Sequence, residues 1–314
     1  GKCGSAPCNL VPWVISTLGG TISGDVMVDW QAPINWAANL TLAHIQPGLQ
    51  WPEAEGDISG AVSTTGNLTE QGGWQVDVPK LDIDGVLREY PLNVAGSVSA
   101  ADVTGNNELS VQTPQLVLSH GPNSIKASGE LDKQWRMDLE LNLPDLIKSV
   151  PDLKGHVVGD VALRGDFKAP DVGLNLVAKG IDWQQQAKVA ELSVKGNVTP
   201  LPTPSGQLSL KVNQAKYQDK VIDDVSLNFA GSQQKHRLNL DVKSNIVSTS
   251  LALTGSLTDK PELVWQGKLE RMRLSSQQGE WRLNQPTALG FEMATEQVSV
   301  AAHCWLQADS SLCL

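Results

Sequence analysis

The feature that most constrains the fold is a glycine-punctuated segment that occurs twice. Glu55–Leu68 reads EGDISGAVSTTGNL, and Lys154–Phe167 reads KGHVVGDVALRGDF. Four positions match at one offset of 99 residues (155 minus 56), which pairs Gly56 with Gly155, Gly60 with Gly159, Val62 with Val161 and Gly66 with Gly165. Internal repetition of this length is typical of an extended array rather than of a compact globule.

Apolar and polar residues alternate with a period of two from about Gly56 onward. Arg136–Leu143, Gln207–Val212 and Arg237–Lys243 all follow this pattern, which predicts strands with one apolar and one polar face. We count roughly twenty such segments. Helical periodicity is nearly absent; the best candidate for a turn or two of helix is Pro144–Leu153, whereas the Pro-Gly in the aligned Gln46–Glu55 disfavours a helix there.

Many predicted strands carry the element apolar, any residue, glycine. Gly255, for example, stands on the apolar parity between Leu253 and Leu257. Glycine at such positions indicates a bend or bulge, and a stacked set of bends rolls one sheet into a trough. The sequence therefore predicts an all-β fold, an elongated antiparallel sheet rolled into an open groove with at most one or two short helices.

Two other all-β architectures remain open at this point. One is a pair of ordinary β-sandwich domains, whose facing sheets fill each other's space. Aromatic residues make up 5% of the chain, which favours an unfilled apolar lumen over that filled core. The other is an outer-membrane barrel; the three Phe and two Tyr argue against aromatic girdles, while the ten Trp keep this alternative.

A looser repeat continues beyond the first. Ile125–Trp135 (IKASGELDKQW) resembles Leu251–Pro261 (LALTGSLTDKP), with Gly129 matching Gly255. We therefore expect one continuous elongated domain of four parts. These are a partial repeat with the Cys3/Cys8 loop at 1–55, a β-groove repeat unit at 56–154, a second unit with extra strands at 155–270, and a partial repeat with Cys304/Cys313 at 271–314.

The four cysteines form one close pair near each end of the chain. The spacing predicts two local disulfides, Cys3–Cys8 and Cys304–Cys313, and hence an oxidising compartment. Free buried thiols and end-to-end crosslinks remain alternatives. A zinc site of all four is disfavoured because the spacings are loose for tetrahedral ligand pairs.

Charge and motifs exclude several classes of function. The net charge of −10 and the lack of clustered Lys and Arg disfavour a nucleic-acid partner. No GxxxxGK[ST] loop is present, and Gly20–Gly24 and Gly56–Gly60 are GxxSG rather than the GxSxG elbow of hydrolases. We expect no enzyme, no cofactor and no metal. The five histidines are scattered along the chain, and we expect them to be solvated strand residues rather than metal ligands: His44, His120, His156, His236 and His303.

No apolar run approaches the roughly 18 residues that a membrane helix needs. The first residues, GKCGSAPCNL, contain neither an initiator methionine nor a signal peptide. We therefore expect a mature chain or a fragment of one.

Two longer sequence segments resemble those of a known family. Gly155–Trp183 (GHVVGDVALRGDFKAPDVGLNLVAKGIDW) and Ser205–Ser232 (SGQLSLKVNQAKYQDKVIDDVSLNFAGS) are similar to the TamB family, which belongs to the AsmA-like repeating β-groove proteins of the Gram-negative envelope. The resemblance implies a long sheet rolled into a taco-like groove, whose apolar inner surface conducts phospholipid across the periplasm.

The same resemblance implies partners and a location. A family member is anchored in the inner membrane and pairs with a TamA-like outer-membrane barrel. The N-terminal anchor and the C-terminal domain that meets the barrel are missing from this sequence. The chain thus resembles a middle section of the periplasmic part, which reaches the inner membrane, the outer membrane and the barrel through the missing segments.

The groove-lining residues are expected among the apolar positions of the alternating strands. Sequence alone leaves a lumen lining and a filled β core about even, and the resemblance favours the lining. The predicted lining set is Leu139, Leu141, Leu143, Val172, Leu174, Leu176, Leu208, Leu210, Val225, Leu227, Leu238, Leu240, Leu251, Leu253 and Val300.

Two functions follow for such a chain. The first is lipid transport, in which the groove shields phospholipid acyl chains between the inner and outer membranes. The alternative is a periplasmic scaffold or chaperone whose exposed strand edges capture outer-membrane strands by β-augmentation.

Overall fold

The computed structural model describes residues 8–31, 33–259 and 263–314, with side chains from Trp13 onward. Its 22 strands belong to one antiparallel sheet, and they divide between two compact units. Among the described residues, β1 (Cys8–Thr17) pairs with β2 (Gly20–Asp29) alone, so no pairing closes the sheet into a barrel. The predicted class, an all-β antiparallel sheet left open, is confirmed.

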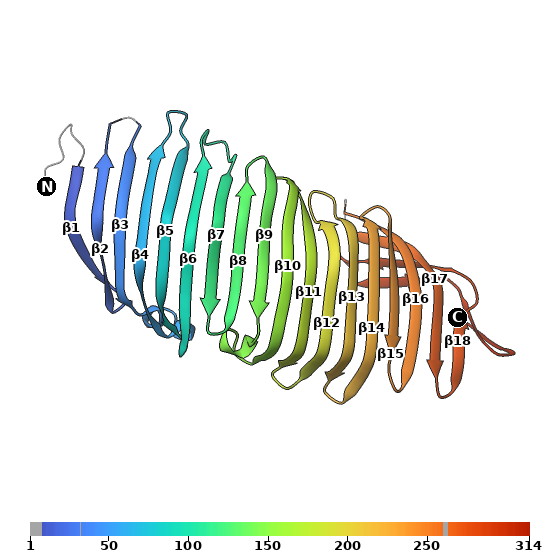
Figure 1. Ribbon diagram of the computed structural model, residues 1–314. Helices are drawn as coiled ribbons and strands as arrows, with labels where there is room; N and C mark the ends of the chain where they lie inside the picture. The colour runs from blue at the N-terminus through green and yellow to red at the C-terminus, as the bar shows by residue number, and fades with distance from the viewer. Residues whose placement is uncertain (1–7, 32, 260–262) are drawn as a thin grey trace. The chain divides into compact units, whose positions relative to one another are not determined.

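The first unit consists of Gly1–Pro151 and Ala162–Phe167. From β1 to β9 each strand pairs with the next one in the chain, and Figure 1 shows them side by side from blue to green. After β1 and β2 the strands are β3 (Asn35–Ile45), β4 (Gly56–Leu68), β5 (Trp74–Leu87), β6 (Tyr90–Asp102), β7 (Ser110–His120), β8 (Asn123–Leu131) and β9 (Gln134–Leu143). The strand β10 (Leu153–Asp166) contributes residues to both units.

The second unit consists of Asp152–Val161 and Lys168–Leu314. From β11 to β17 consecutive strands pair, after which β17 pairs with both β18 and β19, β18 with β21, β19 with β20, and β21 with β22. The strands are β11 (Ala169–Trp183), β12 (Ala187–Thr199), β13 (Ser205–Tyr217), β14 (Lys220–Ser232), β15 (His236–Lys243), β16 (Val247–Thr258), β17 (Val264–Ser276), β18 (Gly279–Leu283), β19 (Thr287–Glu292), β20 (Gln297–Val300), β21 (Cys304–Gln307) and β22 (Ser310–Cys313).

Helical structure in the described part of the chain is limited to three single 3₁₀ turns: η1 (Pro47–Leu49), η2 (Pro52–Ala54) and η3 (Leu146–Lys148). The expected turn in Pro144–Leu153 is therefore present as η3. The doubt about Gln46–Glu55 was wrong for single turns, because each of η1 and η2 opens on a proline, whose missing N–H is not needed there. η1 and η3 begin 99 residues apart, at Pro47 and Leu146, so the repeat extends to these turns.

The register gathers the apolar residues of neighbouring strands into continuous rows. Because side chains alternate along a strand, each row lies on one face, called the apolar face below, and the other is the polar face. One such row crosses β3 to β9 in the first unit. Its members are Leu40, Val62, Leu81, Gly96, Leu116, Ala127 and Leu139.

Glycines in these rows allow neighbouring backbones to approach closely. A Cβ added to Gly60 would lie 2.4 Å from the carbonyl oxygen of Asp82 and 2.7 Å from the Cα of Ile83. Gly206, at φ +136°, stands opposite Gly231. A side chain fits at neither position, as expected where a sheet bends sharply.

The apolar face is not filled like an ordinary core. Among the described residues no large side chain is fully buried. The accessible surface is 19325 Å², against roughly 12,700 Å² for a compact monomer of this mass. The buried apolar residues are Ala38, Ile45, Leu131, Leu146, Ala178, Ala252 and Leu269. Most apolar side chains therefore stay partly accessible.

Candidate functional site

Two parallel apolar rows run across the second unit from β11 to β17. Row 1 contains Leu176, Val194, Leu210, Leu227, Leu240, Leu251 and Met272. Row 2 contains Leu174, Gly196, Leu208, Phe229, Leu238, Leu253 and Leu269. Directly opposed side chains in adjacent strands contact one another, so the two rows form a continuous apolar strip across seven strands.

Nine of the fifteen predicted lining residues lie in these two rows. Val172 stands opposite Val198, and Val225 lies between Val212 and Val242, in the flanking rows. In the first unit, Leu139 pairs with Ala127 and Leu141 with Ile125, while Leu143 ends β9 beyond its register with β8.

Val300 stands apart from the other predicted residues. Val300 lies on the short strand β20, where it pairs with Leu289 of β19, and its side chain is 50% exposed. The other fourteen predicted residues are half-buried. A filled sandwich buries its facing Leu and Val side chains almost completely, so half-burial favours a lining over a packed core.

The predicted set omitted apolar residues that complete the rows. Val194 lies between Leu176 and Leu210, and Phe229 between Leu208 and Leu238. The same period-two pattern contained the signal, because Val194 alternates with Ser193 and Lys195.

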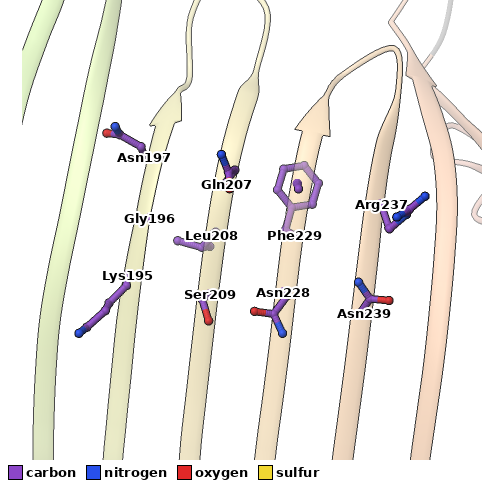
Figure 2. Close-up of a pocket in the computed structure, with 11 residues that line it drawn as sticks. Lys195, Gly196, Asn197, Gln207, Leu208, Ser209, Asn228, Phe229, Arg237 and Asn239 are labelled. Carbon is purple, nitrogen blue, oxygen red and sulfur yellow. The ribbon is translucent and has the colours of Figure 1, made fainter.

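A hollow of about 400 Å³ lies across β12 to β15. Its residues come from β12, β13, β14 and β15, and Figure 2 shows Lys195 and Arg237 on opposite sides of the group. No carboxylate is among the residues that line it, and Lys195 stands directly opposite Ser209. The lining residues are Lys195, Gly196, Asn197, Gln207, Leu208, Ser209, Asn228, Phe229, Ala230, Arg237 and Asn239.

A second hollow, of about 290 Å³, is lined by three arginines of β17 and β18. Arg271, Arg273 and Arg282 surround it together with Ser250, Met272 and Leu283. The expectation that Lys and Arg are not clustered was therefore wrong. The sequence shows that Arg271 and Arg273 are two positions apart and so lie on the same face of a strand. Only the pairing of β17 with β18 brings Arg282 opposite Arg273.

The expectation that all five histidines are solvated was wrong for His120, which is 8% exposed. Its Nε2 lies 2.8 Å from the carbonyl oxygen of Leu87, and its Nδ1 lies 3.0 Å from Oγ of Ser149. Asn123, 3% exposed, donates to Asp145 O and to Ser149 Oγ at 2.7 Å each. These bonds attach the segment around η3 to the sheet, so His120 has a structural role.

Lys148 of η3 adds a contact of the same kind. Its Nζ lies 2.9 Å from the hydroxyl of Tyr90 and 4.5 Å from the centroid of that ring. The hydrogen bond to Tyr90 raises the pKa of Lys148, although desolvation opposes it. In the second unit, the Lys188 ammonium 3.0 Å from Asp182 lowers the pKa of that carboxyl.

The disulfide expected between Cys304 and Cys313 is present. The two cysteines are directly opposed in β21 and β22, and their Cα atoms are 4.0 Å apart. The other expected bridge, Cys3–Cys8, has one partner, Cys3, outside the described residues.

Residues 8–31, 33–259 and 263–314 provide neither a metal centre nor a membrane-spanning helix. In that part of the chain no three His, Cys, Asp or Glu residues are placed to hold a metal ion. No helix there has the length and hydropathy needed to cross a membrane.

Comparison with known proteins places the chain in a family. Residues 2–314 match the family model described as TamB, N-terminal domain. The chain belongs to the TamB family. A Haemophilus influenzae relative, the translocation and assembly module subunit TamB, is 29% identical over 286 residues, which cover 91% of this chain and 21% of that protein.

A more distant relative extends the TamB comparison. Uncharacterized protein BU087 of Buchnera aphidicola is 20% identical over 223 residues, covering 71% of this chain and 22% of its own length. The chain thus spans about a fifth of either relative. No solved structure matches.

Proposed function

We propose that this member of the TamB family is a non-catalytic part of a bridge for phospholipid in the periplasm, with acyl chains held against the apolar face. The observation that carries the proposal is the pair of half-buried apolar rows across β11 to β17. Among the described residues no large side chain is fully buried, which supports a lining that stays accessible.

The energetics support an apolar conduit. At about 0.8 kcal/mol per buried CH₂, a sixteen-carbon chain costs roughly 13 kcal/mol to expose to water. A continuous strip of Leu, Val and Phe removes most of that cost while a headgroup stays hydrated at the open side. We propose that other segments of the full protein reach the inner and outer membranes and a TamA-like barrel, in keeping with the translocation and assembly module named for the H. influenzae relative.

The first test asks whether the purified chain holds lipid in row 1. Leu210 and Leu240 both flank Leu227 in that row. A double Leu210→Asp, Leu240→Asp variant puts two charges where acyl carbons would lie. We expect lipid extraction and mass spectrometry to find phospholipid with the unmodified chain and at least fivefold less with the variant.

The matched control carries the same charges on the other face. Ser209 and Asn239 are the chain neighbours of Leu210 and Leu240 on the polar face, and both pair with Asn228. Ser209→Asp with Asn239→Asp should retain the lipid. Circular dichroism checks that both variants keep the sheet. Equal lipid in all three proteins, or none in the unmodified chain, would contradict the proposal.

The alternative function is capture of unfolded outer-membrane strands by β-augmentation. A chain that purifies without lipid but binds denatured barrel strands would favour this role.

A further inference from the structure

The three arginines around the second hollow lie on the polar face of the second unit. Arg273 stands opposite Ser250 on one side and Arg282 on the other, and Arg271 stands opposite Ala252. Met272 separates Arg271 from Arg273 and belongs to row 1 of the apolar face. Alternation along β17 therefore directs the arginines away from the apolar rows.

Acidic side chains do not neutralise this group. Nε of Arg273 lies 3.3 Å from Oε1 of Glu280. Among the described residues, Arg271 and Arg282 form no ion pair with a carboxylate. Asp241 lies one strand further away, opposite Ser250. Glu270 accepts a hydrogen bond from Thr254 at 2.7 Å. Three guanidinium groups thus meet one paired carboxylate.

The basic cluster occurs in the less acidic part of the sequence. The first unit (residues 1–151 and 162–167) contains 8 Lys and Arg against 18 Asp and Glu, a net −10, whereas the second unit (residues 152–161 and 168–314) contains 16 against 16, a net 0, which together give the −10 of the chain. An anion approaching β17 and β18 therefore meets little long-range repulsion from the second unit.

We propose that the hollow between Arg271, Arg273 and Arg282 binds a phosphate group. Guanidinium presents paired N–H donors that match phosphate oxygens in a bidentate geometry. Ser250 lines the same hollow, and a serine hydroxyl can supply one more donor. The phosphate has two possible sources, the headgroup of an anionic lipid or a soluble phosphate. The site lies on the opposite face from the proposed lipid groove and does not depend on it.

The test measures two probes against the same variants. Binding to vesicles of 75% phosphatidylcholine and 25% phosphatidylglycerol is followed by flotation, and binding of inorganic phosphate by isothermal titration calorimetry. Arg271→Gln with Arg282→Gln removes two arginines and leaves the Arg273–Glu280 pair. We expect at least a tenfold loss of affinity for each probe that binds the unmodified chain.

Two controls separate a site from general surface charge. Lys211→Gln with Lys243→Gln removes the same net charge from exposed positions of β13 and β15, and we expect less than a twofold change. Arg271→Lys with Arg282→Lys keeps the charge but loses the paired donors, so an intermediate loss is expected.

The outcomes decide both the site and the source of the phosphate. Arginine-dependent vesicle binding that inorganic phosphate displaces supports a lipid headgroup, whereas arginine-dependent binding of inorganic phosphate alone supports a soluble ligand. Equal losses in the arginine and lysine variants, or no binding of either probe, would overturn the proposal. Lipid extracted from the apolar groove is a separate readout, so either proposal can fail alone.

Discussion

Gly60 stands where the backbones of β4 and β5 approach each other closely. It stands opposite Ile83 in β5 and Leu42 in β3, within the apolar face. The backbone of β5 occupies the place where its side chain would be. Close packing leaves such a contact no free volume to absorb even one methyl group.

We predict that Gly60→Ala destabilises the first unit. The new Cβ would meet the carbonyl oxygen of Asp82 at 2.4 Å, so β4 or β5 must shift. Overpacking of this kind costs about 1–3 kcal/mol in the free energy of unfolding. Urea unfolding followed by circular dichroism measures the change. Thr65→Ala, at an exposed position of the same strand, is the control, and equal stability of the two variants would show that the glycine is not needed for close approach.

The strands could be predicted from the sequence because their signal is local. Alternation in Arg136–Leu143 and in Arg237–Lys243 defines which residues share a face, and the register places Leu238 and Leu240 where that pattern requires. A period of two depends only on neighbouring residues. The apolar rows follow from it once consecutive strands pair.

Features that depend on which distant residues meet could not be predicted. His120 is buried because Ser149, 29 positions later, is attached to it. Arg282 joins Arg271 and Arg273 only because the hairpin after β17 returns it to Arg273. The residue types and sequence spacings of His120 and Arg282 suggest isolated, solvated positions. Their actual neighbours come from contacts between residues far apart in the sequence, which local patterns do not show.

The strands β21 and β22 form a hairpin that the Cys304–Cys313 disulfide joins across its two strands. It joins the remainder of the second unit through the pairs Arg282–Leu306 and Leu283–Trp305 of β18 and β21. We predict that the double variant Cys304→Ser, Cys313→Ser loosens this hairpin. The disulfide lowers the entropy of the unfolded chain, which for so short a loop stabilises the folded state by about 2–3 kcal/mol. Hydrogen exchange should rise in β21 and β22 and stay unchanged in β11 to β16.

Reduction of the unmodified chain with dithiothreitol is the matched control for that experiment. It should reproduce the exchange pattern of the double variant. Unchanged protection of β21 and β22 after reduction would mean that strand pairing alone holds the hairpin.

The accessible surface of the chain is unusually large for its mass. The chain exposes 19325 Å², about half as much again as a compact monomer of its mass. Large contiguous apolar surface on a folded chain indicates a surface for a partner or ligand. The half-burial of the apolar rows therefore favours a lined groove over a filled sandwich, whose facing side chains are almost completely buried.

We therefore predict that the native chain binds the fluorescent dye ANS. A protein with a filled core binds this dye mainly in partly unfolded states, whereas here the apolar rows are accessible in the folded state. Fluorescence should be several times that of free dye without denaturant and should fall steadily as urea unfolds the sheet. Added phospholipid should displace the dye, and the Leu210→Asp, Leu240→Asp variant should bind less of it than the Ser209→Asp, Asn239→Asp control. A weak native signal that rises at intermediate urea would instead show that the Leu and Val rows are covered in the folded protein, because only loosening would then open them to the dye.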